Sequence, residues 1–211
     1  MKKFELTNEF ITNMFGTKLF RIRALVEFGD VEAGELGGYV EKESNLGHDD
    51  NAWVYDNAWV YGNARVYGDA QVSGDARVSG NARVYDNAWV YGNAQVSGNA
   101  RVYGNALVCG NAWVYGNAWV YGNALVCSDE DYAYAHGFGS VNRTTTFFRL
   151  KDGGVGVRCG CFYGTLAQFR DKIRETHGET KKAQEYLMLA DLMELRFEED
   201  ENEVGNRKYV E

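Results

Sequence analysis

Residues 51–128 read NAWVYD, NAWVYG, NARVYG, DAQVSG, DARVSG, NARVYD, NAWVYG, NAQVSG, NARVYG, NALVCG, NAWVYG, NAWVYG and NALVCS, an array of 13 six-residue units with no insertion. The array contains all five Trp of the 211-residue chain, and 10 of the 25 Gly end one of its units. A fixed short period outweighs other fold signals, because every unit must repeat the same local structure. The fold is therefore predicted from this array.

Each unit is typical of a short strand followed by a corner. In residues 52–55 (AWVY) the alternation of a strand puts Ala and Val on one side and Trp and Tyr on the other. Ala and Val occur in every unit, so we expect them to face inward, while the variable residues face outward. The Gly-Asn or Gly-Asp step supplies residues that tolerate positive φ, and Asp56 and Asp86, which replace Gly, are compatible with such a corner.

The pattern V-x-G-[ND]-A-x resembles the hexapeptide repeat of left-handed parallel β-helices, in which three units make one triangular coil. The resemblance implies a mainly β fold with 18 residues per coil and about four coils, roughly 20 Å tall at the usual strand spacing. A right-handed or amyloid-like stack of the same units is the alternative.

Three units per coil place every third unit on the same face, so the outward residues can be sorted. The first face carries Trp53/Tyr55, Gln71/Ser73, Trp89/Tyr91, Leu107/Cys109 and Leu125/Cys127. The second carries Trp59/Tyr61, Arg77/Ser79, Gln95/Ser97 and Trp113/Tyr115. The third, which we call the Arg/Tyr face, carries Arg65/Tyr67, Arg83/Tyr85, Arg101/Tyr103 and Trp119/Tyr121.

The Arg/Tyr face is the predicted ligand site. Three Arg at a strand spacing of about 5 Å repel one another unless an anion or an aromatic ring relieves them. Arg side chains bind phosphate or carboxylate oxygens and Tyr rings stack on bases, so we expect a small anionic ligand such as a nucleotide, or an acidic protein surface. The alternative is that the Arg only stack on their Tyr neighbours. The predicted ligand-binding residues are Arg65, Arg83, Arg101, Tyr67, Tyr85, Tyr103, Tyr121 and Trp119.

Aromatic side chains on the other two faces form apolar patches that a monomer rarely exposes. The resemblance implies a side-by-side homo-oligomer, specifically a trimer. The alternative is that the rings only stack along the array. The predicted interface residues are Trp53, Trp59, Trp89, Trp113, Tyr55, Tyr61, Tyr91 and Tyr115. Cys109 and Cys127 lie 18 residues apart in adjacent coils, where a disulfide is conceivable, but two free thiols are expected in a reducing compartment.

The flanks are predicted to cap the array, with domains at 1–50, 51–128 and 129–211. Residues 18–25 (KLFRIRAL) are typical of a strand in an N-terminal β cap, and residues 34–41 form a Gly-rich lead-in to the first coil. After the acidic boundary at residues 129–131, residues 144–150 and 155–161 around the turn 151–154 predict a β-hairpin.

Two helices are predicted to complete this α+β cap. Residues 165–168 (TLAQ) form a capping box that opens a helix closing at Gly178. A second helix is predicted from Lys181 to about Phe197, followed by a solvated acidic tail from Glu198. Its predicted apolar positions are Ala183, Tyr186, Leu187, Ala190, Leu192 and Leu195.

Composition narrows the class of protein. The net charge of −8 comes from the flanks, because the array has four Arg and four Asp, and it disfavours an extended nucleic acid as partner. No apolar run approaches the length of a membrane span, and the N-terminal residues do not form a secretory signal. A cytoplasmic protein without a membrane partner is expected.

The flanks also resemble segments of small repeat proteins of bacteriophages and prophages. The matching residues are Arg21 to Leu25, Gly34 to Glu43 and Thr146 to Gly178. The resemblance implies phage origin, and with it a protein that counters a host defence by capturing a signal nucleotide or a host protein in the bacterial cytoplasm.

Catalytic and metal functions are disfavoured. Hexapeptide-repeat acyltransferases use a His base and a loop thrown out of the helix, but the array is uninterrupted and His48, His136 and His177 lie outside it. His136 and His177 are expected in a turn and at a helix end. Cys159 and Cys161 with His177 lack an evident fourth zinc ligand, and no phosphate-binding Gly loop is present. We therefore predict no catalytic residue, no metal and no cofactor.

Overall fold

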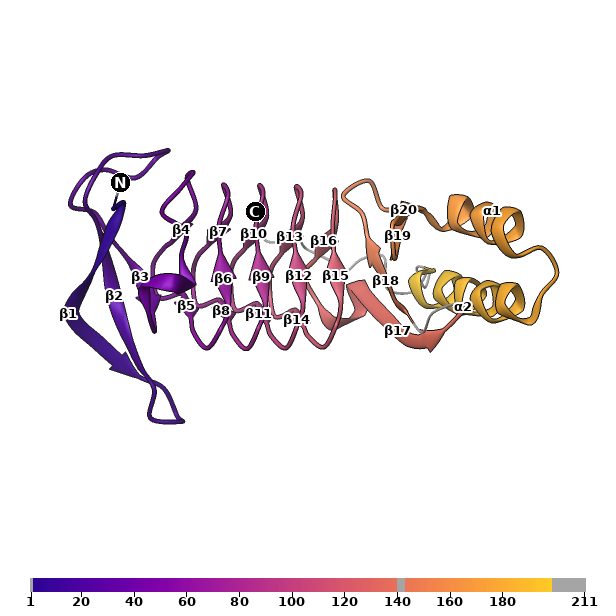
Figure 1. Ribbon diagram of the computed structural model, residues 1–211, viewed down its shortest axis with the longest axis horizontal. Coiled ribbons are helices and arrows are strands. Elements are labelled where there is room, and N and C mark those ends of the chain that lie inside the picture. Colours follow the sequence, from indigo (N-terminus) through magenta and orange to yellow (C-terminus); the bar gives the residue numbers. More distant parts are fainter. Residues whose placement is uncertain (1, 140–142, 199–211) are drawn as a thin grey trace. The chain divides into compact units, whose positions relative to one another are not determined.

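The computed structural model describes residues 2–139 and 143–198, and the chain divides into two compact units between Asp129 and Glu130. The first unit contains the repeat array and everything before it, and the second contains a small sheet and two helices (Figure 1). The acidic tail predicted from Glu198 lies almost wholly outside the described residues.

The array folds as a parallel β-solenoid (Figure 1). Every six-residue unit contributes a two-residue strand ending at its Val, and strands 18 residues apart pair in parallel, as Arg83 with Arg101 and Trp89 with Leu107. The strands are β4 (Trp53–Val54), β5 (Trp59–Val60), β6 (Arg65–Val66), β7 (Gln71–Val72), β8 (Arg77–Val78), β9 (Arg83–Val84), β10 (Trp89–Val90), β11 (Gln95–Val96), β12 (Arg101–Val102), β13 (Leu107–Val108), β14 (Trp113–Val114), β15 (Trp119–Val120) and β16 (Leu125–Val126).

Three sheets form the walls of the solenoid, in the strand orders β4-β7-β10-β13-β16, β5-β8-β11-β14 and β6-β9-β12-β15. They correspond to the three faces sorted by counting. Every Ala and Val of the array faces inward with at most 1% of its surface exposed, which confirms the predicted inward pair. Backbone hydrogen bonds join the coils: the Arg83 N–H donates to the Ala100 carbonyl at 2.9 Å and the Tyr85 N–H to the Val102 carbonyl at 3.1 Å.

The corners have the positive φ that the sequence predicts. Asp56 and Asp86 adopt φ of 53° and 57° in place of Gly. Each Asp carboxylate accepts a hydrogen bond from the backbone N–H of the Gly one coil later, Gly74 for Asp56 and Gly104 for Asp86. These bonds offset part of the cost of a non-Gly residue in a left-handed conformation.

The N-terminal cap is an antiparallel sheet that continues into the solenoid. Strand β2 (Lys18–Ala24), which was predicted, pairs with β1 (Phe4–Thr12), which was not, and with β3 (Leu36–Val40). Strand β3 also pairs in parallel with β5, so the cap and the second face form one seven-stranded sheet. The open edge of the first coil is thereby covered.

The lead-in is itself a coil. Tyr39 pairs with Trp59 and, beyond the 3₁₀ turn η1 (Glu43–Asn45), Leu46 bridges to Val66, each 20 residues further on rather than 18. A two-residue offset before the array therefore hides this coil from a search for a fixed period. With it the solenoid has about five turns.

The second unit contains a four-stranded antiparallel sheet, β17 (Tyr132–Phe138), β18 (Arg143–Arg149), β19 (Val155–Cys159) and β20 (Phe162–Thr165), preceded by the short turn η2 (Asp129–Asp131). The β18–β19 hairpin confirms the predicted one. Strands β17 and β20 were not predicted, and His136 lies within β17 rather than in a turn. The sequence of β17, YAYAHGF, contains no β-branched residue and includes Gly, so it carries only a weak strand signal.

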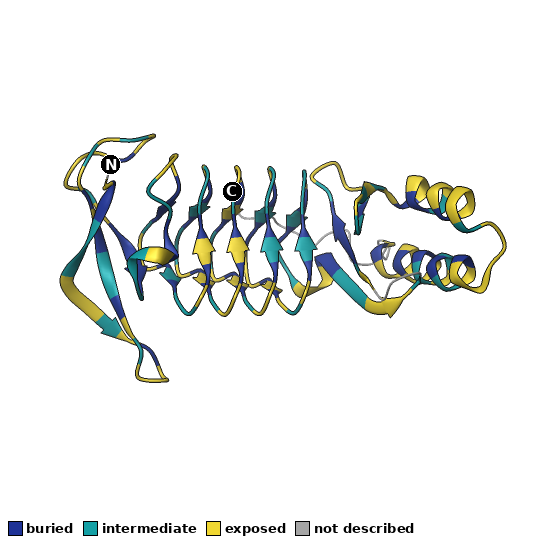
Figure 2. Cartoon of the chain, viewed as in Figure 1, coloured by how far each residue is buried: buried dark blue, intermediate teal, exposed yellow. Residues whose placement is uncertain are grey.

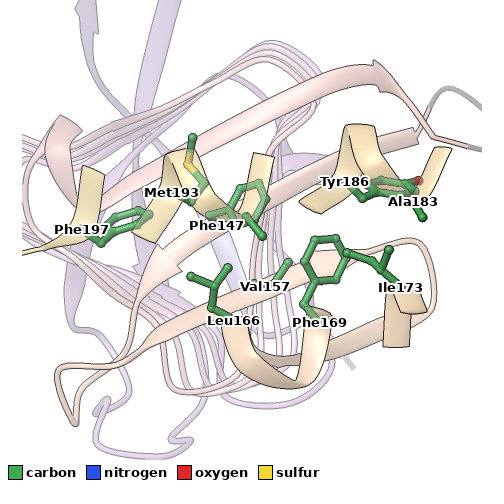
Figure 3. Packing of buried hydrophobic residues seen from close by; sticks show 10 residues of the cluster. Phe147, Val157, Leu166, Phe169, Ile173, Ala183, Tyr186, Met193 and Phe197 are labelled. Carbon is green, nitrogen blue, oxygen red and sulfur yellow. The ribbon is translucent and has the colours of Figure 1, made fainter. Parts of the chain in front are cut away.

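Both predicted helices are present, α1 (Leu166–His177) and α2 (Lys181–Phe197). The Thr165 hydroxyl accepts a hydrogen bond from the Gln168 N–H and completes the predicted capping box, and Gly178 closes α1. The predicted apolar side of α2 is partly wrong. Leu192 and Leu195 are 54% and 67% exposed, whereas Met193 and Phe197 are buried together with Ala183, Tyr186 and Ala190. Figure 3 shows Met193 and Phe197 packed with Phe147 and Val157 of the sheet.

Candidate functional site

The backbone register brings the predicted ligand residues into one row. Strands β6, β9, β12 and β15 place Arg65, Arg83, Arg101 and Trp119 directly beside one another on the Arg/Tyr face. Figure 2 shows this sheet as a row of arrows, exposed at β6 and β9 and half-buried at β12 and β15. Each coil therefore contributes one Arg or Trp side chain to this row.

The tyrosines of the Arg/Tyr face form a continuous stack. Ring centroids lie 4.9 Å apart for Tyr67 and Tyr85, 4.8 Å for Tyr85 and Tyr103, and 4.4 Å for Tyr103 and Tyr121. Burial within this stack, and secondarily the neighbouring Tyr103 and Tyr67 hydroxyls, raise the pKa of Tyr85 to about 12, against the opposing effect of Arg101. Because the two inner rings, Tyr85 and Tyr103, each have a Tyr ring on both faces, they offer mainly their edges to a ligand.

The three arginines of the face differ in their contacts. The Arg101 guanidinium lies 4.6 Å from the centre of the Trp119 ring, and that of Arg65 lies 5.8 Å from the Tyr67 ring. Arg83 is exposed, and within residues 2–139 and 143–198 its side chain has no hydrogen bond, ion pair or ring contact. Stacking on rings, the alternative raised by the sequence, thus accounts for Arg65 and Arg101 but not for Arg83.

The tryptophans predicted at an oligomer interface have different environments. Trp53 is fully buried, so its assignment to an exposed interface was wrong. The N-terminal cap covers it, with the Phe4 and Phe28 rings at 6.2 and 5.3 Å. Trp59 is half-buried beneath the Arg77 guanidinium, 4.5 Å from its ring centre.

Trp89 and Trp113 remain exposed, at 42% and 48%. Each indole N–H donates to a Ser hydroxyl of the preceding coil, Ser73 or Ser97, at 3.2 and 3.1 Å. Each Trp ring also contacts the ring of the Tyr two residues later, with centroid distances of 5.0 Å for Tyr91 and 5.2 Å for Tyr115. Among the four tyrosines predicted at the interface, Tyr115 is exposed, while Tyr55, Tyr61 and Tyr91 are half-buried.

The cysteines of the first face were predicted as free thiols, and this was wrong. Cys109 and Cys127 form a disulfide, with Cα atoms 4.3 Å apart in adjacent coils. Cys109 is only 3% exposed, because stacking of the coils places Cys127 against it.

The second unit brings together the three residues that the sequence raised, and disfavoured, as zinc ligands. Cys159, Cys161 and His177 all line one cavity, where Tyr186 joins them. Across the described part of the chain, no group of three or more His, Cys, Asp or Glu has a geometry that could hold a metal ion. The sequence had grouped Cys159, Cys161 and His177, but it gave no sign that Tyr186 would join them.

The other two histidines are engaged locally. The His48 ring stacks on Phe4 with a centroid distance of 4.5 Å, and its Nδ1 accepts a hydrogen bond from the Lys3 N–H. His136 Nδ1 lies 3.0 Å from the Thr144 hydroxyl on the edge of the small sheet. Neither lies on the repeat array. None of the helices in the described ranges is both long and apolar enough to cross a membrane.

The repeat array is similar to a known family of repeats. A family model described as "YdcK Beta solenoid repeat" matches residues 58–74, 70–82, 76–92, 94–110 and 106–122, all within the stacked coils. No curated protein matches the chain. The parallel coils and the matched repeats together show that the chain is a repeat-containing β-solenoid protein.

Proposed function

We propose that this protein is a non-enzymatic binding protein and that its Arg/Tyr face holds an anionic partner. The observation that carries the proposal is Arg83, an exposed cation in the middle of a regular row without a partner among the described residues. A carboxylate or phosphate oxygen would pair with this guanidinium and relieve its repulsion from Arg65 and Arg101.

The geometry of the row favours an acidic stretch of a protein over a nucleotide. A base would stack on a Tyr ring, but the inner rings of the face already stack on one another at 4.4–4.9 Å. Carboxylates spaced along an extended chain meet no such obstacle, because they need only the guanidinium groups and the Tyr edges. With phage origin, as the flanks imply, the partner would be a host defence protein and binding would inhibit it.

The test compares two arginines of the array that differ in face. Binding of hexaglutamate and of ATP is measured by calorimetry at low salt for the wild type, Arg83→Glu and Arg77→Glu. Arg77 is the matched control, since it has the same charge and lies on the second face over Trp59. We expect hexaglutamate binding to fall at least about tenfold in Arg83→Glu, as for a lost charged hydrogen bond, and to be retained in Arg77→Glu.

Equal binding by all three proteins would refute the assignment and leave a purely structural scaffold. Binding of ATP that exceeds binding of hexaglutamate and depends on Arg83 would restore the nucleotide. The acyltransferase alternative requires a His at the coils, and the array has none.

Self-association side by side is the second part of the proposal. Trp113 and Tyr115 form an exposed aromatic pair on the second face, 48% and 44% exposed, and Trp89 is exposed on the first. We expect sedimentation to report a homo-oligomer, a trimer by the resemblance to left-handed β-helices, and Trp113→Ser to dissociate it. Trp89→Ser tests the other face, and a wild-type monomer at micromolar concentration would exclude the oligomer.

A further inference from the structure

The second unit contains a cavity of about 300 Å³, at the lower end of the volumes of small-molecule sites. The residues that line it come from β18, β19, the turn after β19, β20 and both helices. It is distinct from the Arg/Tyr face and lies entirely within the second unit.

The strand register explains why polar residues gather there. Thr145 pairs with Cys159, two positions beyond the pair Phe147 and Val157, so all four lie on the face that the helices cover. Phe147 and Val157 are fully buried in the core. Arg143 is two residues further along the same face of β18 and also lines the cavity.

The walls of the cavity are aromatic. Phe162 and Phe169 have ring centroids 5.4 Å apart, and Phe169 meets Tyr186 edge to face at 5.8 Å. Figure 3 shows Phe169 and Ile173 of α1 opposite Tyr186 of α2. Such walls suit a flat apolar ring, which gains both from burial and from edge-to-face contacts.

The cavity lining includes basic residues. These are Arg143, Lys172 and His177, and none of the described lining residues is acidic, although the chain has a net charge of −8. Lys172 is partly neutralised by Glu175 at 2.8 Å. Arg143 lies against the turn at Gly160, where a Cβ would collide with its guanidinium, so glycine at this position lets the Arg reach the cavity.

From these contacts we propose that the cavity is a binding site for a small aromatic anion, with the ring between Phe162, Phe169 and Tyr186 and the anionic group on Arg143. Cys159 also lines the site. It accepts a hydrogen bond from the Thr145 hydroxyl at 3.1 Å and lies 3.9 Å from the Tyr186 hydroxyl. A ligand that fills the cavity therefore covers this thiol.

The first experiment measures binding of 2-naphthoate and of its neutral analogue 2-naphthamide to the full chain by calorimetry. Naphthoate is expected to bind more tightly than naphthamide, and Arg143→Gln to weaken naphthoate at least about tenfold while leaving naphthamide unchanged, since only the anion pairs with the guanidinium. Arg174→Gln is the matched control, because Arg174 is an exposed Arg of α1 paired with Asp171 outside the cavity.

The second experiment uses Cys159 as a reporter in a Cys161→Ser background, where it is the remaining free cysteine. Naphthoate is expected to slow alkylation of Cys159 by iodoacetamide, and the slowing to disappear in Arg143→Gln. Circular dichroism checks that the variants stay folded. Equal affinity for the two probes, no effect of Arg143→Gln on naphthoate, or no protection of Cys159 would each overturn the proposal.

Discussion

The two units of this chain build their interiors in opposite ways. Inside the solenoid the array repeats Ala and Val in every layer, and backbone hydrogen bonds connect each layer to the next. The second unit instead packs large side chains such as Phe147, Phe169 and Tyr186 around one core. The repeated layers bury small side chains and place the long ones in rows on the outside, whereas the irregular core of the second unit borders a cavity.

The largest expected loss of stability comes from the one position of the array where a large side chain is buried beside the small Ala and Val. Trp53 is the one large aromatic that the array buries among the described residues, and its indole contacts Phe4 and Phe28 of the cap. Trp53→Ala is expected to lower the free energy of unfolding by about 3–5 kcal/mol through the cavity it leaves. Trp113→Ala, at an exposed position of the same repeat, is expected to cost below about 1 kcal/mol. Urea unfolding measures both, and similar losses would contradict the burial of Trp53.

A somewhat smaller effect is expected from a buried ion pair in the second unit. Asp131 and Arg149 lie 3.3 Å apart at 4% and 6% exposure, with the Arg149 guanidinium over the Phe197 ring. Asp131→Ala removes the carboxylate from a buried cation and is expected to cost about 3 kcal/mol. Thermal unfolding followed by the circular dichroism band of the helices would show this loss as a lower midpoint temperature. An unchanged midpoint temperature would refute it.

Glycine positions sharpen the comparison further. Gly98 and Gly153 both have positive φ, but a Cβ at Gly98 would lie 2.9 Å from the Gly116 nitrogen in the next coil, while one at Gly153 meets nothing within 4 Å. Gly153→Ala is expected to cost about 1–2 kcal/mol from the backbone alone. Gly98→Ala is expected to cost more, because two coils must separate. Equal losses would mean that the coils are less tightly stacked.

The smallest effect is a pH dependence. The pKa of Tyr85 rises from its ordinary value of 10 to about 12, chiefly through burial. Between pH 10 and 12 the unfolded chain loses this proton and the folded chain keeps it, so stability falls as the pH rises through that range. Tyr85→Phe is expected to reduce this slope in unfolding experiments at high pH. A slope identical to that of the wild type would show that Tyr85 titrates normally.

The periodic part of the molecule was predictable from sequence because a fixed period determines register. The rows of the Arg/Tyr face and the positive φ of Asp86 follow from counting alone. The burial of Trp53 did not follow, since it depends on the aperiodic strand β1 and its neighbours. The lead-in coil was hidden by its two-residue offset. The sequence grouped Cys159, Cys161 and His177, but the other lining residues of the cavity come from separate segments that share no local pattern, so only packing reveals them.

The most direct test of the account is to observe the Arg side chains of the array during a titration with hexaglutamate, by nitrogen-detected NMR of the guanidinium Nε groups. The account predicts that the Arg83 signal shifts most, that Arg65 and Arg101 shift less because they already contact rings, and that Arg77 stays in place. A shift of Arg77 equal to that of Arg83, or no shift of Arg83 at all, would contradict the assignment of the Arg/Tyr face as the binding surface.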